Sequence, residues 1–115
     1  MPWHARASTG CAPGWVPHNL IIETLTFRLT ADADEAAFLR ADRRVQTEFI
    51  PNQPGFSRRT TARSPKGEWI IVVLWSTEGD AEAAAGLFED HPATQGFASM
   101  LDGATARRER YSTLE

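Results

Sequence analysis

Residues 67–92, GEWIIVVLWSTEGDAEAAAGLFEDHP, decide the fold of this chain. Residues 68–76 have apolar side chains on both faces that an extended strand would present, and many are β-branched or aromatic. This pattern predicts a strand that is covered on both faces. Thr77 follows as a helix N-cap, with Asp80 as its capping-box partner. A helical repeat then places four residues on one side: Ala81, Ala84, Ala85 and Phe88. The stretch predicts a central strand that leads through a tight junction into a helix.

Three further strands are expected outside this stretch. Residues 19–29 alternate as a strand, and an amphipathic helix covers about residues 32–49, with Thr30 as an alternative start. Residues 56–63 and 105–113 are arginine-rich strands suited to sheet edges. The order strand, helix, strand, strand, helix, strand predicts an α+β, ferredoxin-like split βαβ sandwich, with a four-stranded antiparallel sheet and helices on one face.

The first helix has an apolar side and a charged side. Its apolar stripe consists of Ala37, Phe38, Ala41, Val45 and Phe49. The charged residues are expected to face water: Asp34, Glu35, Arg40, Asp42, Arg43 and Arg44. A shorter helix is expected after Pro92, with Gly103 near its end.

Length and composition narrow the class of protein. The chain of 115 residues is long enough for one domain with its own core. Its net charge of -3 argues against a nucleic-acid partner. The single cysteine, Cys11, excludes an intrachain disulfide and a cysteine-based zinc cluster.

Residues 1–18 are rich in proline and glycine and lack periodicity, so we expect a flexible leader before a domain over residues 19–115. Trp3 and Trp15 in this leader could pack on the domain or on a partner. The chain has neither an apolar run of about 20 residues nor a signal-peptide core. We therefore expect a soluble, cytoplasmic protein without a membrane partner.

The central strand also predicts the oligomeric state. Four strands with helices on one face leave the other face open, yet the central strand is apolar on both parities. An exposed apolar face of this kind usually marks an interface. We expect a homodimer whose two sheets pack face to face.

Several short motifs carry a resemblance to a known family. They are the strand end VVLWST at residues 72–77, the PGF at residues 54–56 and the HPA at residues 91–93. With the order of elements, they make residues 19–114 similar to the dimeric α+β barrel superfamily, and within it to the antibiotic biosynthesis monooxygenase-like (ABM) domain. The resemblance implies a dimeric barrel with a pocket in each subunit between sheet and helices.

Members of this superfamily oxidise quinol substrates without metal or flavin, degrade haem, cyclise polyketides, or have no established activity. The resemblance thus implies oxygenation of a small aromatic or quinol substrate with no cofactor and no metal. Trp75 matches the tryptophan of the monooxygenase and haem-degrading members. Where haem-degrading members carry an asparagine, this chain has Glu23 or Thr24, and His91 is the only histidine after residue 18. The cyclase positions that hold histidine and tyrosine read Thr94 and Phe88.

The candidate site combines an apolar pocket with few polar groups. The pocket is expected to use Trp75, Phe27, Phe38, Phe88 and Phe97, with Trp69 as an alternative to Trp75. Glu23 lies on the same face of its predicted strand as apolar residues. It is therefore either a base whose pKa is raised by burial or a partner of Arg108 or Arg110.

The other candidates have two interpretations each. His91 is either an acid or base, or a helix-end residue that bonds to backbone carbonyls. Tyr111 either holds a substrate oxygen or packs on an edge strand. The arginines of the edge strands either bind an anionic substrate or maintain solubility: Arg58, Arg59, Arg63, Arg107, Arg108 and Arg110. A non-catalytic barrel that binds a hydrophobic ligand, and a haem-binding barrel that would depend on His91, stay as alternative functions.

Overall fold

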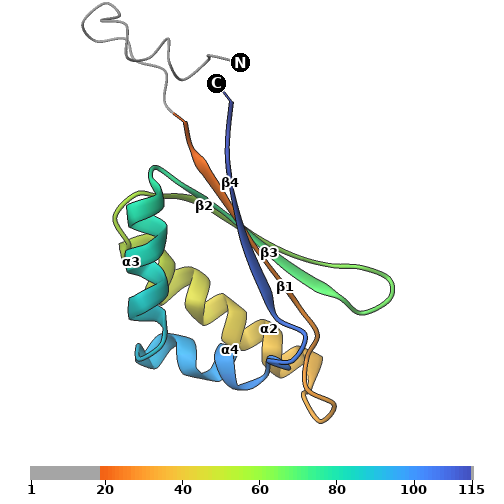
Figure 1. The fold of residues 1–115 in the computed structure, drawn as a ribbon. Coiled ribbons are helices and arrows are strands. Elements are labelled where there is room, and N and C mark those ends of the chain that lie inside the picture. Colours follow the sequence, from red (N-terminus) through yellow and green to blue (C-terminus); the bar gives the residue numbers. More distant parts are fainter. Residues whose placement is uncertain (1–18, 115) are drawn as a thin grey trace, which may run out of the picture.

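Four antiparallel strands form a single sheet in the computed structural model, which describes residues 19–114 (Figure 1). The strands are β1 (Ile21–Phe27), β2 (Phe56–Arg63), β3 (Trp69–Trp75) and β4 (Arg107–Ser112). They lie in the order β2-β3-β1-β4, which puts the two arginine-rich strands at the edges. The predicted ferredoxin-like α+β fold is confirmed. The predicted leader, with Cys11, lies outside the described residues.

The helices all lie on one face of the sheet (Figure 1). They are α2 (Glu35–Arg44), α3 (Glu78–Phe88) and α4 (Gln95–Ser99), joined by the short turns η1 (Val45–Phe49), η2 (Ile50–Asn52) and η3 (Pro92–Thr94). Thr77 caps α3 as predicted, because its Oγ1 accepts a hydrogen bond of 3.0 Å from the Asp80 backbone N–H.

The first helix differs from its prediction at both ends. It begins after Asp34, whose side chain accepts a hydrogen bond of 3.0 Å from the Ala37 N–H, and not at Asp32 or Thr30. Its last turns, η1, widen into a π-helix. Val45 and Phe49 of this segment are both buried, as the predicted apolar stripe requires. π-Helical turns of this kind are frequent at functional sites.

The strand registers align four residues in a row across the sheet. Glu23 of β1 lies opposite Val73 of β3 on one side and opposite Arg110 of β4 on the other. Arg59 of β2 lies opposite Val73 from the far side. Directly opposite residues share one face of a sheet. The row Arg59, Val73, Glu23, Arg110 therefore runs across the face that the helices cover.

Aromatic rings fill one end of the space between sheet and helices. Phe38 of α2 contacts Trp69, Phe97 and Phe27 with ring centroids 4.8, 5.2 and 5.8 Å apart. Phe27 and Phe38 are fully buried. This aromatic cluster (Phe27, Phe38, Trp69 and Phe97) holds α2 and α4 on the sheet.

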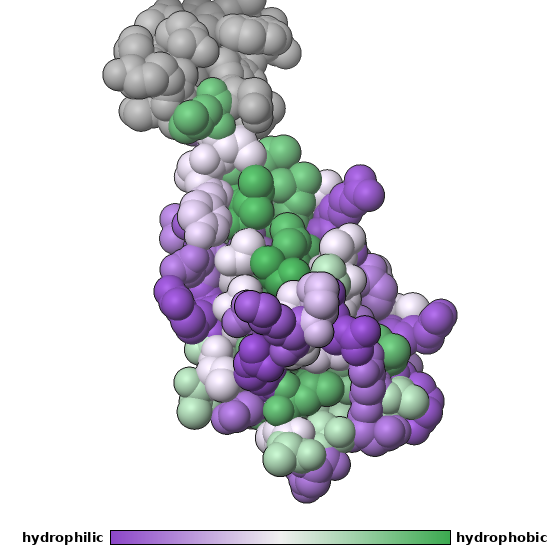
Figure 2. Space-filling view, turned by 90° about the vertical axis from the view of Figure 1, so that its right-hand side faces the viewer, coloured by the Kyte–Doolittle hydropathy of each residue, from purple (hydrophilic) through white to green (hydrophobic). Residues whose placement is uncertain are grey.

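The opposite face of the sheet has no covering element among residues 19–114 (Figure 2). Its centre carries half-buried apolar residues: Leu20, Ile22, Ile70, Val72 and Leu74. Figure 2 shows hydrophobic side chains gathered along this side, with hydrophilic ones around them. None of the helices in the described part of the chain is long and apolar enough to cross a bilayer.

Candidate functional site

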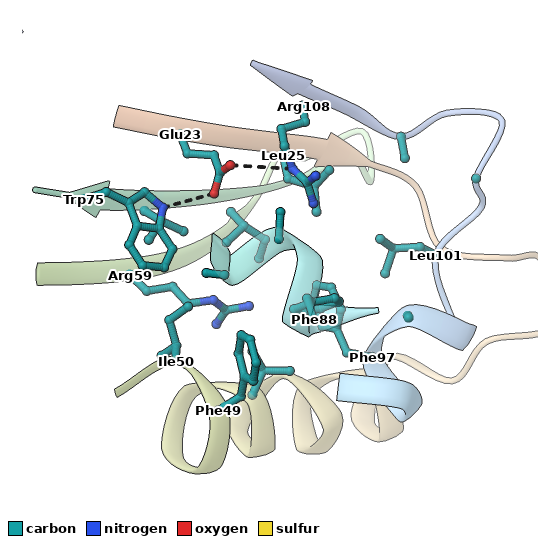
Figure 3. A pocket seen from close by; sticks show the side chains of 18 residues that line it. Glu23, Leu25, Phe49, Ile50, Arg59, Trp75, Phe88, Phe97, Leu101 and Arg108 are labelled. Carbon is teal, nitrogen blue, oxygen red and sulfur yellow. Dashed lines mark hydrogen bonds and ion pairs between the residues drawn. The ribbon is translucent and has the colours of Figure 1, made fainter. Parts of the chain in front are cut away.

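A cavity of about 320 Å³ lies between the sheet and the helices, next to the aromatic cluster (Figure 3). Its walls are mainly apolar and come from all layers: Leu25, Ile71 and Val73 from the sheet, Val45, Phe49 and Ile50 from the first helical region, and Ala84, Ala85, Phe88 and Phe97 from the others. Ala98, Gly103 and Arg108 also line it and are exposed, so they mark its mouth.

Glu23 is the acidic group in this wall. Its side chain is only 11% exposed, and both oxygens are engaged. The Trp75 indole Nε1–H donates to Oε1 at 3.1 Å, and Arg110 Nε donates to Oε2 at 2.8 Å. Arg108 Nε lies 3.7 Å from Oε2. The interpretation that Glu23 pairs with Arg108 or Arg110 is therefore confirmed, and the pairing holds the carboxylate inside the cavity wall.

Arg110 connects this buried carboxylate to the surface. Its Nη1 lies 3.1 Å from Glu82 and 3.9 Å from Glu78 of α3, both well exposed. Burial disfavours the charged form, but the hydrogen bonds and charges of Glu23 and Glu82 outweigh it and raise the pKa of Arg110. Arg110 is thus a permanent cation that orients Glu23 and ties β4 to α3.

Trp75 has its ring inside the cavity wall and its N–H on Glu23 (Figure 3). The side chain is 1% exposed, and the residue lies one step along β3's inner face from Val73. A buried indole requires an acceptor for its N–H, and Glu23 supplies it. Trp75 thus lines the cavity next to Glu23.

Arg59, one of the edge-strand arginines expected either to bind an anionic substrate or to maintain solubility, lines the cavity. Its side chain is 3% exposed, and Nη2 donates to Asp42 Oδ1 at 2.7 Å. Nη1 donates to Gln46 at 3.2 Å, and Thr61 Oγ1 donates to Asp42 Oδ2 at 2.8 Å. The prediction that Asp42 faces water was wrong. α2 presents Asp42 to β2, where a buried carboxylate requires a cationic partner.

The remaining aromatic candidates divide between two places. Phe88 and Phe97 line the cavity. Phe27 and Phe38 are outside its lining, because they pack against each other in the aromatic cluster. Tyr111 is half exposed on the open face of the sheet, and its hydroxyl donates to Glu109. Its strand alternation points it away from Arg110 and the cavity.

His91 is outside the cavity lining as well. Its Nδ1 accepts a hydrogen bond of 3.0 Å from the Ala93 N–H, so it caps the N-terminus of η3. The ring packs edge-on against Phe49, with centroids 5.1 Å apart. The expected bonds from its side chain to backbone carbonyls at a helix end are replaced by this cap. No group of three or more His, Cys, Asp or Glu residues in the range 19–114 is arranged to hold a metal ion.

Solved structures of other proteins share this fold. No protein-family model and no curated protein sequence matches the chain. SnoaB, a cofactor-independent oxygenase from Streptomyces nogalater, superposes with a TM-score of 0.69 at 16% identity, over 84% of this chain and 95% of that one.

Two candidate antibiotic biosynthesis monooxygenases are also similar. The one from Bordetella bronchiseptica has a TM-score of 0.67 at 14% identity, over 84% of this chain and 99% of its own. The one from Nitrosomonas europaea has a TM-score of 0.58 at 16% identity, over 88% and 94%. Identities this low carry the fold alone. The chain has the α+β fold of the antibiotic biosynthesis monooxygenase proteins.

Proposed function

We propose that the protein is a cofactor-independent oxygenase that takes a small aromatic or quinol substrate into the cavity beside Trp75. The observation that carries this proposal is the buried carboxylate of Glu23 in a largely apolar wall. A mainly apolar pocket of about 320 Å³ is at the lower end of the usual range for ligand cavities. The similarity in fold to SnoaB supports the same class of reaction.

Glu23 is the proposed base. A carboxylate offers about four lone-pair sites, and the bonds from Trp75 and Arg110 occupy two of them. The substrate hydroxyl gives its proton to a remaining site on Glu23, which leaves a delocalised anion in the cavity. The two donors hold the carboxylate in place while it accepts this proton.

The oxidation then requires only O₂ as co-reactant. The anion passes one electron to O₂, and the resulting superoxide joins the substrate radical at a ring carbon that carries one hydrogen. The peroxide that forms is protonated by Glu23. Loss of water across the remaining C–H and O–O bonds leaves a carbonyl, so one oxygen atom enters the product and the other leaves as water. The apolar walls keep bulk water from the reactive anion.

A second candidate function is ligand binding without turnover. It is favoured by the engagement of both Glu23 oxygens by Trp75 and Arg110, because a buried carboxylate with a hydrogen bond on each oxygen is also a stable structural feature. The haem alternative depended on His91, whose Nδ1 accepts the Ala93 N–H outside the cavity wall. We therefore do not propose it.

Oxygen consumption distinguishes catalysis from binding. The protein is mixed with anthrone or with 1,4-naphthohydroquinone in an oxygen-electrode cell, and the rate without protein is subtracted. We expect Glu23→Gln to lower the rate at least about 100-fold, the usual contribution of a positioned base. Gln keeps an acceptor for Trp75. The matched control is Glu109→Gln on the outer face of β4, which should leave the rate unchanged. A Glu23→Gln protein with full activity would exclude the proposed base.

We also propose that the open sheet face forms a homodimer. The half-buried residues at its centre include Ile22, Val72 and Leu74, and polar edge strands flank them. A self-complementary apolar patch of this kind suits a two-fold interface. Light scattering after size exclusion should give twice the mass of 12.7 kDa, and Val72→Arg should give the monomer mass. A wild-type chain that stays monomeric at high concentration would contradict the proposal.

A further inference from the structure

We propose that Arg59 is an anion-binding group of the cavity, so that the preferred ligand is an aromatic compound with a negatively charged oxygen on its ring system. The inference rests on the proposed ligand-binding function of the cavity. It concerns the chemical class of the ligand, and it assigns Arg59 a role that differs from that of Glu23.

The first argument is the set of free donors on Arg59. A guanidinium has five N–H groups. Nη2 donates to Asp42, and Nη1 donates to Gln46 and more weakly to Thr61 at 3.5 Å. Within residues 19–114, Nε and the second hydrogen of Nη2 have no acceptor. Two N–H groups of a cation are therefore available to a ligand.

The second argument is the direction in which these donors face. None of the buried side-chain nitrogen and oxygen atoms in the described residues lacks a partner, so the unpaired Nε of Arg59 is not fully buried and reaches accessible space. Arg59 lines the cavity and does not line the groove between α2 and β2 that Asp42 and Gln46 border. Figure 3 shows the guanidinium pointing into the cavity, between Ile50 and Phe49 on one side and the sheet on the other.

The third argument is that the local structure fixes this cation in place. Asp42 and Gln46 hold one side of the guanidinium, and its carbon lies 5.7 Å from the centre of the Phe97 ring. Surrounding side chains exclude solvent, so a charge-assisted hydrogen bond here is strong. A cation used only for solubility would be exposed, whereas Arg59 is 3% exposed.

The fourth argument is the spacing of the polar groups. Arg59 and Glu23 both lie opposite Val73, one on each neighbouring strand. Strands are 4.7–4.9 Å apart, so the two backbones are roughly 10 Å apart. A flat bicyclic ligand over Val73 can reach both groups. Its anionic oxygen then binds Arg59 while a reacting hydroxyl faces Glu23, and the bound cation stabilises the anion from which an electron leaves.

Two ligand chemistries share this requirement, a ring carboxylate and an acidic ring hydroxyl. Their probes are 2-naphthoate and 2-hydroxy-1,4-naphthoquinone, and 2-naphthamide is the neutral match to the naphthoate. Binding to the full chain is measured by calorimetry in oxygen-free buffer at neutral pH, so that no turnover is needed. We expect both anions to bind about 10- to 100-fold more tightly than the amide. Binding of only one anion identifies which oxygen chemistry the site accepts.

Arg59→Met should remove this preference and leave 2-naphthamide affinity within about twofold. Because that change leaves Asp42 without its cation, Arg59→Met with Asp42→Asn is the second variant, and thermal unfolding checks that both fold. Arg58→Met, at the exposed neighbouring position of β2 outside the cavity lining, is the matched control, and it should keep the preference.

The following outcomes would reject the anion site at Arg59 or the use of the cavity as a ligand site. Equal binding of amide and anions by the wild-type protein, or a preference that survives Arg59→Met, overturns the anion site and leaves the cavity as a neutral ligand site. Loss of the preference in Arg58→Met alone also overturns it. If none of the probes binds the wild-type protein, both the anion site and the proposed use of the cavity fail.

Discussion

The two ends of the space between sheet and helices are built differently. At the end near Phe27 and Trp69, which we call the filled end, the aromatic cluster fills the space with rings in contact. At the end near Trp75, which we call the hollow end, a cavity of about 320 Å³ remains, with Glu23 and Arg59 in its wall. The same sheet face and the same helical layer supply both ends. The difference shows that the helix residues, more than the strands, decide where this fold is solid and where it is hollow.

Side-chain volume explains the difference. α2 places Phe38 on the sheet, whereas α3 places Ala81 and Ala84 there, each nearly or fully buried. Protein interiors pack at near-crystalline density, so small side chains at fixed helix spacing leave space that no neighbour fills. Both buried carboxylates pair with an arginine next to this space: Glu23 of the cavity wall pairs with Arg110, and Asp42 pairs with Arg59 of the wall. We expect substitutions at the two ends to have unequal effects.

The largest effect is expected at the filled end. Phe38→Ala removes a fully buried ring that contacts Phe27, Trp69 and Phe97, and it should lower the free energy of unfolding by about 3–5 kcal/mol. Phe88→Ala at the hollow end is the matched control. Its ring already borders empty space, so it loses fewer dispersion contacts and should cost less. Urea unfolding measures both, and equal losses would contradict the comparison.

A smaller effect on stability is expected when the hollow end is filled. Ala84→Leu adds apolar volume to the cavity wall, and it should change the free energy of unfolding by less than about 1.5 kcal/mol. It should also block uptake of 2-naphthamide. The control is Ala83→Leu on the exposed side of α3, which should bind the probe as the wild type does. If Ala84→Leu is destabilised by several kcal/mol, or still binds the probe, the space is not the ligand site.

The sequence was sufficient for the features that depend on local pattern. Alternation placed Glu23 on the same face as Ile21 and Phe27, and it placed Trp75 on the face of Trp69. The predicted strand over residues 56–63 has the bounds Phe56–Arg63 in the structure. The pairing of Glu23 with an arginine of the last strand followed from the need to neutralise a buried carboxylate.

The features that the sequence could not supply depend on long-range geometry. Arg59 and Arg58 look alike along β2, and only the packing of α2 against that strand buries the first beside Asp42. The alternation along β2 gave part of this information. Arg59 and Thr61 lie on the same face of the strand, and Asp42 bonds to both. The cavity itself depends on how closely α3 approaches the sheet. The spacing of residues along the alanine-rich helix does not determine this distance.

The smallest effect is expected on the outer face of β4. There the Glu109 carboxylate pairs with the Tyr111 hydroxyl in water, whereas the Glu23 carboxylate pairs with the Trp75 indole in the cavity wall. The hydrogen bond and charge of Glu109 raise the pKa of the Tyr111 phenol, and Arg107 acts in the opposite direction. The hydrogen bond persists while the phenol is protonated, so it is lost as pH rises through this raised pKa. Because Tyr111 is the one tyrosine of the chain, ultraviolet absorbance of tyrosinate reports its titration directly. Glu109→Gln should lower the pKa of Tyr111 and Arg107→Met should raise it further, while both leave ligand binding unchanged. A change in 2-naphthamide affinity in either variant would show that the outer face is coupled to the hollow end.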